Sequence, residues 1–388
     1  MNKTKILIVA PKNNQTIGLC SLNLYEAFYS QNNIEVKCVV VHKFKNGYPG
    51  FDECESCVKS KSSMFNKPFS FIKQLFWLKR IKQTFRPDIT ISTLGRCSTL
   101  NILSGGNERK IGIFHSPHTQ EKDKGLIIYL YTLFEYHYVF PKLDKLACVS
   151  IGVKNHILES FKEYKNKKVD VIYNIHNVDD IKTKAQENLS DKEKSLVNSN
   201  SIIYVGRLDN NKAPMRALHA FYEAIENIPE NANLIFIGKD TDNILPSLQE
   251  FIRDKNLSSR VYFLGFQKNP YKYLSHAKCL ISTSYSEGLP GVMIESLYLG
   301  KPVISTNSSG GVWEILSCYD AFQPNIEDIY ISEDGIITSN LAATNKLKYN
   351  IDIRNLAKAI HSVYKMKPVT FKFKEQIDSN IIIHKFLQ

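Results

Sequence analysis

Short runs of β-branched and other apolar residues alternate with longer helical patterns along most of the chain. Buried parallel strands are typically near-continuous apolar runs, whereas helices repeat apolar residues every three or four positions. The strands predicted in the first half are Lys5–Val9, Val36–Val41, Asp88–Ser92, Lys110–Phe114, Lys145–Val149 and Val169–Tyr173. The helices predicted between them are Leu19–Ser30, Phe69–Phe85, Leu126–Tyr138 and Val153–Phe161, the last with Ser150 as N-cap. This alternation predicts an α/β fold.

The second half repeats the same pattern. Its predicted strands are Ser201–Val205, Leu234–Ile237, Val261–Leu264, Cys279–Ser282 and Pro302–Ser305, and its predicted helices are Pro214–Asn227, Leu245–Lys255 and Val292–Leu299. The chain has 388 residues, more than the roughly 250–300 that one core usually serves. Two domains are therefore expected, with a boundary near Tyr173–Asn177. The polar segment Ile181–Asn200 has little periodicity and is predicted to be a surface loop.

The amino-acid composition limits the chemical classes of partner that we expect this protein to bind. The formal net charge of +12 favours anionic partners, such as phosphates, nucleic acid or an acidic lipid surface. No basic recognition helix or aromatic–basic ribonucleoprotein motif is present, so nucleic acid is not expected as a partner.

Several features predict a cytoplasmic protein. The N-terminal residues read as a first strand rather than a signal peptide, and the most apolar stretch, Leu126–Phe140, is shorter than the ~20 apolar residues of a membrane span. Cys38, Cys148 and Cys279 lie in strand-like runs, where a free thiol behaves as a small apolar side chain. Cys54 and Cys57 form a lone Cys-x-x-Cys pair without the further ligands of a structural zinc site.

Polar residues follow the predicted strand Cys279–Ser282. Backbone N–H groups at about Leu289–Met293, where the next helix starts, would suit a phosphate or a sugar oxygen, and Pro290 would suit the first turn. Glu287 could accept hydrogen bonds from sugar hydroxyls. Glu295, about one turn further along, could accept them from the two hydroxyls of a ribose.

A second strand, Ser201–Val205, runs into a loop with a turn glycine, Gly206, and two cations, Arg207 and Lys212. Ligands of open α/β sheets bind beyond the carboxyl ends of the strands. The two cations could neutralise a diphosphate leaving group, which is the task of a divalent metal in other enzymes.

Together these segments resemble the retaining glycosyltransferases of family four, which have the GT-B fold of two Rossmann-like domains with parallel sheets facing a central cleft. Glu287-Gly-Leu-Pro-Gly-Val-Met-Ile-Glu295 resembles the family's Glu-x7-Glu signature, and Val205-Gly-Arg-Leu resembles a second family segment. Lys212 stands at the position of the family lysine, although the common Lys-Gly is Lys212-Ala213 here. The resemblance is strong over Lys145–Leu316 and weak before it.

The resemblance implies a role for each of these residues. Arg207 and Lys212 would bind the donor diphosphate, Glu295 the ribose, and Glu287, with the backbone that follows it, the donor sugar. The donor-binding residues expected on this basis are Gly18, Arg207, Lys212, Phe266, Gly288, Leu289, Pro290 and Glu295, with the base near Gly265–Phe266. No metal or other cofactor is expected, because the nucleotide-sugar, a UDP-sugar by preference over GDP or ADP, is itself the substrate.

In the first half, His115 follows a strand and resembles the family position at which a histidine approaches the reacting centre. We expect His115 and Glu287 to be the residues nearest the chemistry, and His118 to contact the acceptor or the sugar. The loop Pro11–Gly18 departs from the family pattern of paired glycines, because only Gly18 is available there. Ser308–Glu314 resembles a family loop and is expected to contribute only its backbone shape.

The implied organisation is an N-terminal acceptor-binding domain over residues 1–174, a nucleotide-sugar domain over 175–365, and a segment 366–388 that returns toward the N-terminal domain. The implied activity is transfer of a sugar, with retention of anomeric configuration, to a glycan or lipid-linked acceptor in bacterial surface polysaccharide synthesis.

Four alternatives remain open. Asp240-Thr-Asp242 matches the letters of a metal-binding Asp-x-Asp. A nucleotide-sugar epimerase shares the two-domain fold, and a non-catalytic partner subunit of another transferase would share it too. Finally, the basic amphipathic segment 69–86 could lie on an anionic membrane or be an ordinary packing helix with a solvated basic face.

Overall fold

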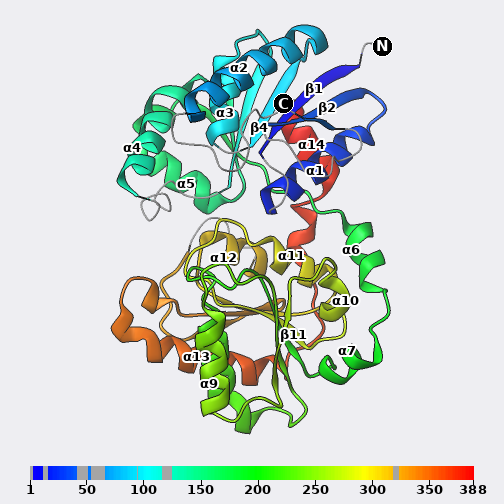
Figure 1. Cartoon of the computed structure of the whole chain (residues 1–388), viewed down its shortest axis with the longest axis vertical. Coiled ribbons are helices and arrows are strands. Elements are labelled where there is room, and N and C mark those ends of the chain that lie inside the picture. Colours follow the sequence, from blue (N-terminus) through cyan, green and yellow to red (C-terminus); the bar gives the residue numbers. More distant parts are fainter. Residues whose placement is uncertain are drawn as a thin grey trace. The chain divides into compact units, whose positions relative to one another are not determined.

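A computed structural model describes residues 3–11, 16–41, 51–53, 66–93, 95–115, 125–317 and 323–388 (Figure 1). The chain forms two compact units. Unit 1 comprises Met1–His176 with Gln376–Gln388, and unit 2 comprises Asn177–Glu375. Residues 366–375, which we expected to return to the N-terminal domain, thus belong to unit 2. Asp334 of unit 2 holds this segment by accepting hydrogen bonds from the backbone N–H groups of Thr370 and Phe371, at 2.9 and 2.7 Å.

Unit 1 is built on a parallel sheet of seven strands in the order β3-β2-β1-β4-β5-β6-β7. The strands are β1 (Thr4–Ala10), β2 (Ile34–Val40), β3 (Phe51–Glu53), β4 (Ile89–Thr93), β5 (Arg109–Phe114), β6 (Lys145–Cys148) and β7 (Lys168–Val171). The β-branched runs predicted six of them. The sequence did not predict β3, because a strand of three residues at the sheet edge has no apolar run of its own.

The helices of unit 1 are α1 (Thr16–Tyr29), α2 (Asn66–Phe85), α3 (Gly95–Leu103), α4 (Leu126–Phe134), α5 (Ile151–Ser160) and α14 (Ser379–Leu387). As predicted, the Ser150 side chain caps α5 by accepting from the N–H of Val153. The predicted helix Leu126–Tyr138 changes to a π-helix at Glu135–Val139. The sequence did not predict α3. None of the described helices is both long and apolar enough to cross a bilayer.

Helix α2 packs against the sheet mainly through one side. Leu78 is buried in a core cluster with Leu7 and Val9 of β1, and Phe71 and Leu75 pack against that cluster. Lys82 is one of the cations of the basic amphipathic segment 69–86, but it is only 5% exposed. Its Nζ lies 2.7 Å from Glu108, and burial lowers the pKa of the Lys82 ammonium to about 8. The basic outer face of α2 therefore excludes Lys82.

Three cations hold the C-terminal helix α14 on unit 1. Arg109 donates to the carbonyl groups of Phe386 and Leu387, at 2.9 and 3.0 Å. Lys145 donates to that of Lys385 at 2.6 Å, and Lys168 donates to that of Gln388 at 2.8 Å. The last carbonyl groups of a helix carry partial negative charge and lack helical partners, so cations stabilise this end.

Unit 2 is built on a second seven-stranded sheet, in the order β10-β9-β8-β11-β12-β14-β13. Its strands are β8 (Ile202–Val205), β9 (Leu234–Ile237), β10 (Val261–Gly265), β11 (Cys279–Ser282), β12 (Val303–Thr306), β13 (Ile329–Ile331) and β14 (Gly335–Thr338). All neighbours are parallel except β13 and β14. The prediction of an α/β fold with two parallel sheets is confirmed, but the hairpin at this edge was not predicted.

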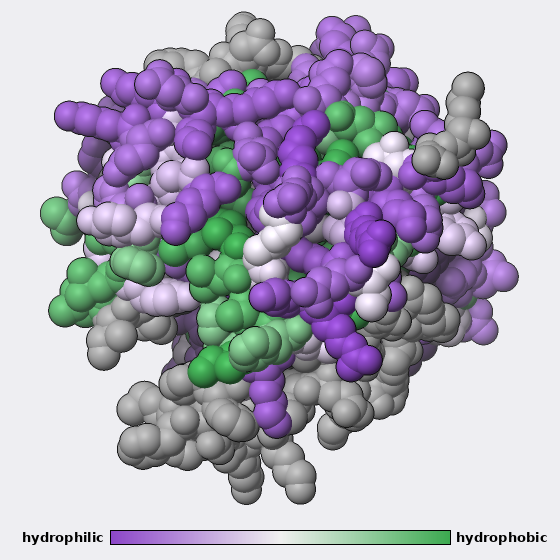
Figure 2. Space-filling view, turned by 90° about the horizontal axis from the view of Figure 1, so that it is seen from above, coloured by the Kyte–Doolittle hydropathy of each residue, from purple (hydrophilic) through white to green (hydrophobic). Residues whose placement is uncertain are grey.

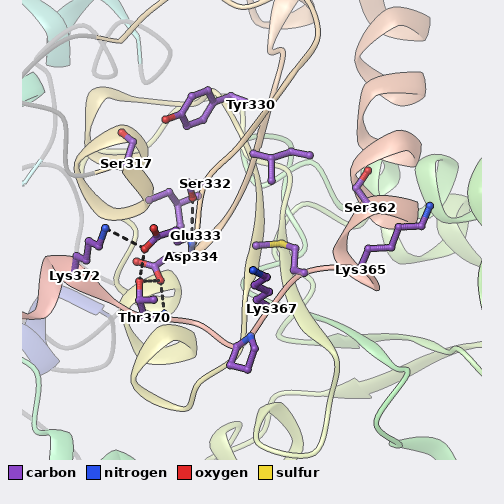
Figure 3. Close-up of a pocket in the computed structure, with 14 residues that line it drawn as sticks. Ser317, Tyr330, Ser332, Glu333, Asp334, Ser362, Lys365, Lys367, Thr370 and Lys372 are labelled. Atoms are coloured by element: carbon purple, nitrogen blue, oxygen red, sulfur yellow. Dashed lines mark hydrogen bonds and ion pairs between the residues drawn. The ribbon is translucent and has the colours of Figure 1, made fainter.

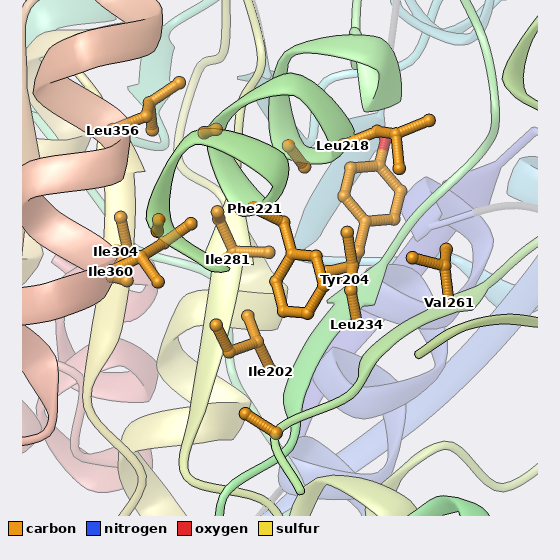
Figure 4. Packing of buried hydrophobic residues seen from close by; sticks show 14 of the residues in the cluster. Ile202, Tyr204, Leu218, Phe221, Leu234, Val261, Ile281, Ile304, Leu356 and Ile360 are labelled. Atoms are coloured by element: carbon orange, nitrogen blue, oxygen red, sulfur yellow. The ribbon is translucent and has the colours of Figure 1, made fainter. Parts of the chain in front are cut away.

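The helices of unit 2 are α6 (Val178–Ala185), α7 (Asp191–Leu196), α8 (Pro214–Ala224), α9 (Leu245–Asp254), α10 (Tyr271–Leu274), α11 (Gly291–Tyr298), α12 (Gly310–Ser317) and α13 (Tyr349–Val363). Helices α8 and α13 pack side by side against the sheet, where Phe221 and Leu356 are fully buried (Figure 4). The prediction of a surface loop over Ile181–Asn200 is wrong. Helix α6 covers its start, and a capping box between Ser190 and Glu193 starts α7.

A buried ion pair connects α8 to α13. The guanidinium of Arg216 lies 2.9 Å from the carboxylate of Asp352, and these side chains are 1% and 0% exposed. Arg216 also donates to the Asn340 side chain at 2.7 Å. Asp352 also accepts from the N–H groups of Leu341 and Ala342, at 3.0 and 2.8 Å. Hydrogen bonds to both charges offset the cost of burying them.

We predict that Asp352→Ala destabilises unit 2 by about 3–5 kcal/mol, because it leaves the Arg216 charge buried without its partner. The matched control is Asp328→Ala, which removes the exposed Asp328–Lys358 pair, whose side chains are 62% and 54% exposed. Removing an exposed pair should cost at most about 1 kcal/mol. Thermal unfolding of both variants measures the difference. Equal losses in the two variants would contradict the importance of the buried pair.

Candidate active site

In each sheet the strand order reverses direction at one place. In unit 2 this switch point lies between β8 and β11, and in unit 1 between β1 and β4. Ligands of open α/β sheets bind beyond the carboxyl ends of the strands at such a point. The loops that follow β8 and β11 are residues 206–213 and 283–290, which contain Arg207, Lys212 and Glu287.

The loop after β8 is held by its own polar groups. The hydroxyl of Tyr204 donates to the carbonyl groups of Arg207 and Lys212, at 3.0 and 3.2 Å. Asp209, 6% exposed, accepts from the N–H of Lys212 at 2.7 Å and pairs with the guanidinium of Arg207 at 3.0 Å. The Arg207 side chain is 56% exposed, so its guanidinium remains accessible to a ligand.

Two backbone positions in and beside this loop are unusual. A Cβ on Gly238 would lie 1.7 Å from the carbonyl oxygen of Gly206, so only glycine allows the chain after β9 to approach so closely. Ala213 has a φ of +47°, in the left-handed region that disfavours side chains. The family's glycine would occupy this position without strain. Ala213, which stands in place of the family's glycine, therefore keeps the left-handed turn but introduces backbone strain.

The loops after β8 and β11 are joined by hydrogen bonds. The N–H of Tyr285 donates to the carbonyl of Asn211 at 2.8 Å, and the Asn211 amide donates to that of Ser286 at 3.0 Å. The ammonium of Lys212 lies 2.5 Å from the carboxylate of Glu287. A phosphate that binds Lys212 therefore shares its ammonium group with Glu287.

Helix α11 begins beside this pair. Pro290 is its N-cap, one position earlier than the first turn where we expected it. Within the described residues, the N–H groups of Gly288, Leu289, Gly291 and Val292 have no acceptor. Unpaired N–H groups at a helix start are donors for an anionic or electron-rich oxygen.

The loop that follows β12 fixes the position of this helix start. The Ser309 hydroxyl donates to the carbonyl of Gly288 at 3.2 Å. A Cβ on Gly311 would lie 2.2 Å from the same carbonyl oxygen, so Gly311 permits the contact. Within Ser308–Glu314, for which we expected only a contribution from backbone shape, the Ser309 side chain thus also takes part.

Glu295 lies further along α11 and bonds with the Tyr271 hydroxyl of α10. Burial raises the pKa of the Glu295 carboxyl to about 7, while the hydrogen bond from Tyr271 opposes this rise. The pKa of Tyr271 is also raised, first by burial and then by the Glu295 charge. The carboxyl can thus change charge near neutral pH.

The other residues singled out in unit 2 are Phe266 and the two aspartates of the Asp-x-Asp. Phe266 follows β10 and is 75% exposed. Asp240 accepts from the N–H groups of Ile244 and Leu245, both at 3.1 Å, at the start of α9. Asp242 accepts from the backbone and side-chain N–H groups of Asn210, at 3.0 and 2.8 Å. Both carboxylates of the Asp-x-Asp thus have structural partners.

The predicted residues of unit 1 follow its strands. His115 comes directly after β5, and its Nε2 is buried without a partner among the described residues. Burial lowers the pKa of His115 to about 4, so the ring is neutral at pH 7. Gly18 lies within helix α1 rather than in the loop before it. His118 lies outside the described residues.

A cavity of 880 Å³ in unit 2 lies near the amino ends of the parallel strands, whereas the joined loops follow their carboxyl ends (Figure 3). It is lined by the turn before β14, with Glu333 and Asp334, and by the segment after α13. Lys372 pairs with Glu333 at 3.0 Å, and Asp334 is saturated by Thr370 and Phe371. The amino edge of the sheet is remote from the loops after β8 and β11, so this cavity is separate from the candidate site.

Several residues that shape the site were not singled out in the sequence. Asp209 follows Arg207 by two positions, a spacing that suggests an ion pair. Tyr271, the partner of Glu295, lies in a short helix without a recognisable motif. Asn340, which donates to the carbonyl of Tyr285 at 2.9 Å, comes from a loop after an unpredicted strand. Only the fold brings Tyr271 and Asn340 to the site.

We predict that Glu295→Gln stabilises the ligand-free protein at pH 8.5 by up to about 3 kcal/mol and changes little at pH 4.5. The raised pKa means that the folded state retains a proton between about pH 4.5 and 7. The stability associated with that proton is present at low pH and lost as the pH rises through 7. Unfolding midpoints at both pH values test this, with Glu250→Gln on the exposed side of α9 as control. Equal effects at both pH values would contradict the raised pKa.

The family described as glycosyl transferases group 1 matches residues 185–329. An uncharacterised glycosyltransferase of Methanocaldococcus jannaschii is 29% identical over 297 residues, 72% of each chain. An α-1,4-N-acetyl-D-galactosaminyltransferase of Campylobacter jejuni, named for a diphospho-undecaprenol-linked substrate, is 26% identical over 310 residues, 77% of this chain and 73% of its own.

Solved structures share the fold at lower identity. HepE of Anabaena in complex with UDP and glucose has a TM-score of 0.64 at 14% identity, covering 99% of this chain and 98% of its own. Sucrose-phosphate synthase of Thermosynechococcus elongatus has a TM-score of 0.66 at 15% identity, covering 99% of both chains. The folds agree with the predicted GT-B class. Residues 185–329, which include the loops after β8 and β11, match the group 1 glycosyltransferases, and the two relatives named as glycosyltransferases are similar over 72% and 77% of the chain.

Proposed function

We propose that the protein transfers a sugar from a UDP-sugar to a hydroxyl of a lipid-linked glycan, with retention of anomeric configuration and without a metal ion. The observation that carries this proposal is the set of donors at the switch point of unit 2. Arg207 and Lys212 come from one loop, and the N–H groups of residues 288, 289, 291 and 292 come from a second loop and the start of α11. Hydrogen bonds join the two loops. Positive charge and free N–H groups in one place suit a diphosphate.

Each group then has a chemical role in donor binding. Arg207 and Lys212 neutralise the diphosphate, and Glu295 accepts hydrogen bonds from the ribose hydroxyls. Glu287, with the backbone of Gly288, Leu289 and Pro290, binds the hydroxyls of the donor sugar. Phe266 lies where we place the base, and its 75% exposure leaves a ring face accessible for stacking.

In the proposed reaction the bond between the anomeric carbon and the phosphate oxygen breaks, and a bond from that carbon to the acceptor oxygen forms on the same face. The acceptor proton passes to the departing phosphate oxygen, so no protein nucleophile is needed. Arg207 and Lys212 stabilise the charge that develops on the diphosphate. Glu287 is paired with Lys212, which suits a residue that positions the sugar.

His115 contributes a neutral imidazole to this reaction in our proposal. Burial lowers its pKa to about 4, so its Nε2 can donate or accept one hydrogen bond without carrying charge. We assign it the orientation of a donor-sugar hydroxyl, and we place His118 and Gly18 at the acceptor side on the strength of the family resemblance alone.

The relatives support the substrate classes. Two Campylobacter jejuni enzymes are named for transfer to diphospho-undecaprenol-linked acceptors, and HepE of Anabaena was solved with UDP. A capsular polysaccharide glycosyltransferase of Staphylococcus aureus is 28% identical over 163 residues. We therefore propose a role in bacterial surface polysaccharide synthesis. The thiols of Cys38, Cys97, Cys148 and Cys279 form no disulfide in the described part of the chain, which suits the cytoplasm.

Metal-free catalysis is supported by how the acidic residues are used. Asp240 and Asp242, the one pair at Asp-x-Asp spacing near the site, bond with backbone N–H groups of the described chain. Arg207 and Lys212 supply the positive charge that a divalent ion would otherwise provide. Glu287 bonds with Lys212, so it too has a partner other than a metal.

The outer face of helix α2 supports contact with an anionic membrane. Lys73, Lys79 and Arg80 are exposed there, beside Ile72 and Phe76, which are 48% and 66% exposed. A face that combines exposed apolar side chains with cations is typical of helices that lie on an anionic lipid surface.

Apolar side chains are also exposed on a second helix of unit 1. Leu130 and Phe134 of α4 are 55% and 53% exposed. Seen from above, apolar side chains form a band among polar ones on the surface (Figure 2). Contact with the membrane would bring such a surface close to a lipid-linked acceptor.

The donor site predicts that UDP raises the unfolding temperature in the presence of EDTA, and that Arg207→Ala and Lys212→Ala each remove most of this effect. Losing one charge-assisted contact should weaken binding about tenfold or more. Arg253→Ala, an exposed cation on α9, is the control and should leave the effect unchanged. If UDP, GDP and ADP all fail to bind, or bind only with a divalent metal, a non-catalytic subunit or a metal-dependent enzyme becomes the better assignment.

The membrane contact predicts that replacing Lys73, Lys79 and Arg80 together with glutamine reduces cosedimentation with vesicles that contain about one third anionic lipid. The attraction is electrostatic at roughly 1 kcal/mol per cation, so binding should also fall as salt is added. Replacing the exposed Lys162, Lys165 and Lys167 instead keeps the same net charge in the control. Equal binding by the two triple variants would show that α2 is an ordinary packing helix.

A further inference from the structure

In unit 1, Arg96 follows the switch-point strand β4, just as the loop with Glu287 follows the switch-point strand β11 in unit 2. It lies at the second residue of α3 (Gly95–Leu103), just beyond the carboxyl end of β4. In the strand order of unit 1, β4 is one of the two strands at the switch point. Side chains that follow such a strand face the usual ligand position of an open α/β sheet.

The guanidinium of Arg96 is held in place from one side. It donates to the side-chain oxygen of Gln74 at 2.8 Å, and it lies over the ring of Phe71 at 5.6 Å from the centroid. Gln74 is itself 1% exposed and donates to the carbonyl of Val41 at 2.7 Å. A buried glutamine anchored to the end of β2 therefore fixes the orientation of Arg96.

The charge of Arg96 has no ion-pair partner among the described residues, and its Nε is buried without an acceptor. Lys82 and Lys145, two buried cations of unit 1, differ in this respect, because Lys82 pairs with Glu108 and Lys145 pairs with Asp170. A partly buried cation without a counter-charge is costly, so it marks a position that an anionic ligand can stabilise.

One carboxylate lies in the same region but does not neutralise Arg96. Glu135 accepts a hydrogen bond from Thr99 and interacts with the Tyr131 hydroxyl. A Cβ on Gly95 would lie 2.9 Å from its Oε2, so the carboxylate packs against the start of α3. It forms no ion pair with Arg96. Among the described residues, the charge of Arg96 thus remains without a compensating carboxylate.

We propose that Arg96 binds the diphosphate group of the acceptor. The proposal rests on the proposed function, which supplies an acceptor that carries a diphosphate. A guanidinium presents parallel N–H donors that match two oxygens of one phosphoryl group, whereas an ammonium acts as a point charge. Because Gln74 already fixes the orientation of the Arg96 guanidinium, the Arg96 side chain loses little conformational entropy when it binds a ligand.

The test separates this site from the donor site by using Arg207→Ala/Lys212→Ala as the background, which removes the cations of unit 2. Inorganic pyrophosphate is titrated into this protein with EDTA present, by calorimetry. Binding should remain in the background protein and weaken about tenfold or more when Arg96→Gln is added, as expected for loss of a charge-assisted contact. Lys165→Gln, which removes an exposed cation of unit 1, is the matched control and should not change the affinity.

Circular dichroism and the ligand-free unfolding temperature identify any variant that fails to fold. Arg96→Lys keeps the charge and serves as the second variant, with an affinity expected between those of the background and Arg96→Gln. Pyrophosphate binding that is the same with and without Arg96 would overturn the proposal. Pyrophosphate binding in this background does not depend on UDP binding. A wrong donor assignment would instead appear in the UDP experiment on the unfolding temperature.

The source of the phosphoryl group is tested in the protein with its donor site intact. Arg96→Gln should raise the KM for a short-chain polyprenyl-diphosphate acceptor while the KM for the donor stays within about twofold. An acceptor KM unchanged by the substitution, with inorganic phosphate bound as tightly as pyrophosphate, would identify a free-phosphate site and overturn the acceptor assignment.

Discussion

The buried pair between Arg216 and Asp352 holds together the parts of unit 2 that position the candidate donor site. Arg216 bonds with Asn340, and Asn340 donates to the carbonyl of Tyr285 and, at 3.2 Å, to that of Asn307. The loops after β11, β12 and β14 are thereby tied to helices α8 and α13. Since Glu287 lies two residues beyond Tyr285, the geometry of the candidate donor site depends on a charge that the solvent does not reach.

The two units differ in how they compensate the cation at the switch point of the sheet. Each sheet reverses its strand order once, and in each case the side chains that follow the strands at that point include a cation. In unit 2 the cation Lys212 is paired with Glu287. In unit 1, Arg96 is oriented by a neutral glutamine instead. An ion pair keeps the site neutral between ligands, whereas an unpaired guanidinium retains its full charge for the ligand.

Much of the architecture could be predicted from local patterns, because long apolar runs specify buried strands whatever surrounds them. The predictions failed where an element is short or depends on contacts. The predicted loop Ile181–Asn200 contains most of α6 and all of α7, because caps rather than apolar periodicity define these helices. Spacing along α2 does not distinguish Lys82 from the exposed cations, but Lys82 pairs with Glu108, which lies outside this helix. Such burial depends on residues distant in the sequence.

The sequence by itself determined which chemical groups follow which strands, and with them the class of the enzyme. Arg207, Lys212 and Glu287 are read directly from their positions after two apolar runs, since a strand and its following loop are contiguous. Only the tertiary structure decided which charges are compensated. Three features depend on distances between segments that are far apart in the chain. They are the pairing of Lys212 with Glu287, the raised pKa of Glu295, and the lack of an ion-pair partner for Arg96 among the described residues. Electrostatic energy depends on separation in space and on burial, which a linear pattern does not contain.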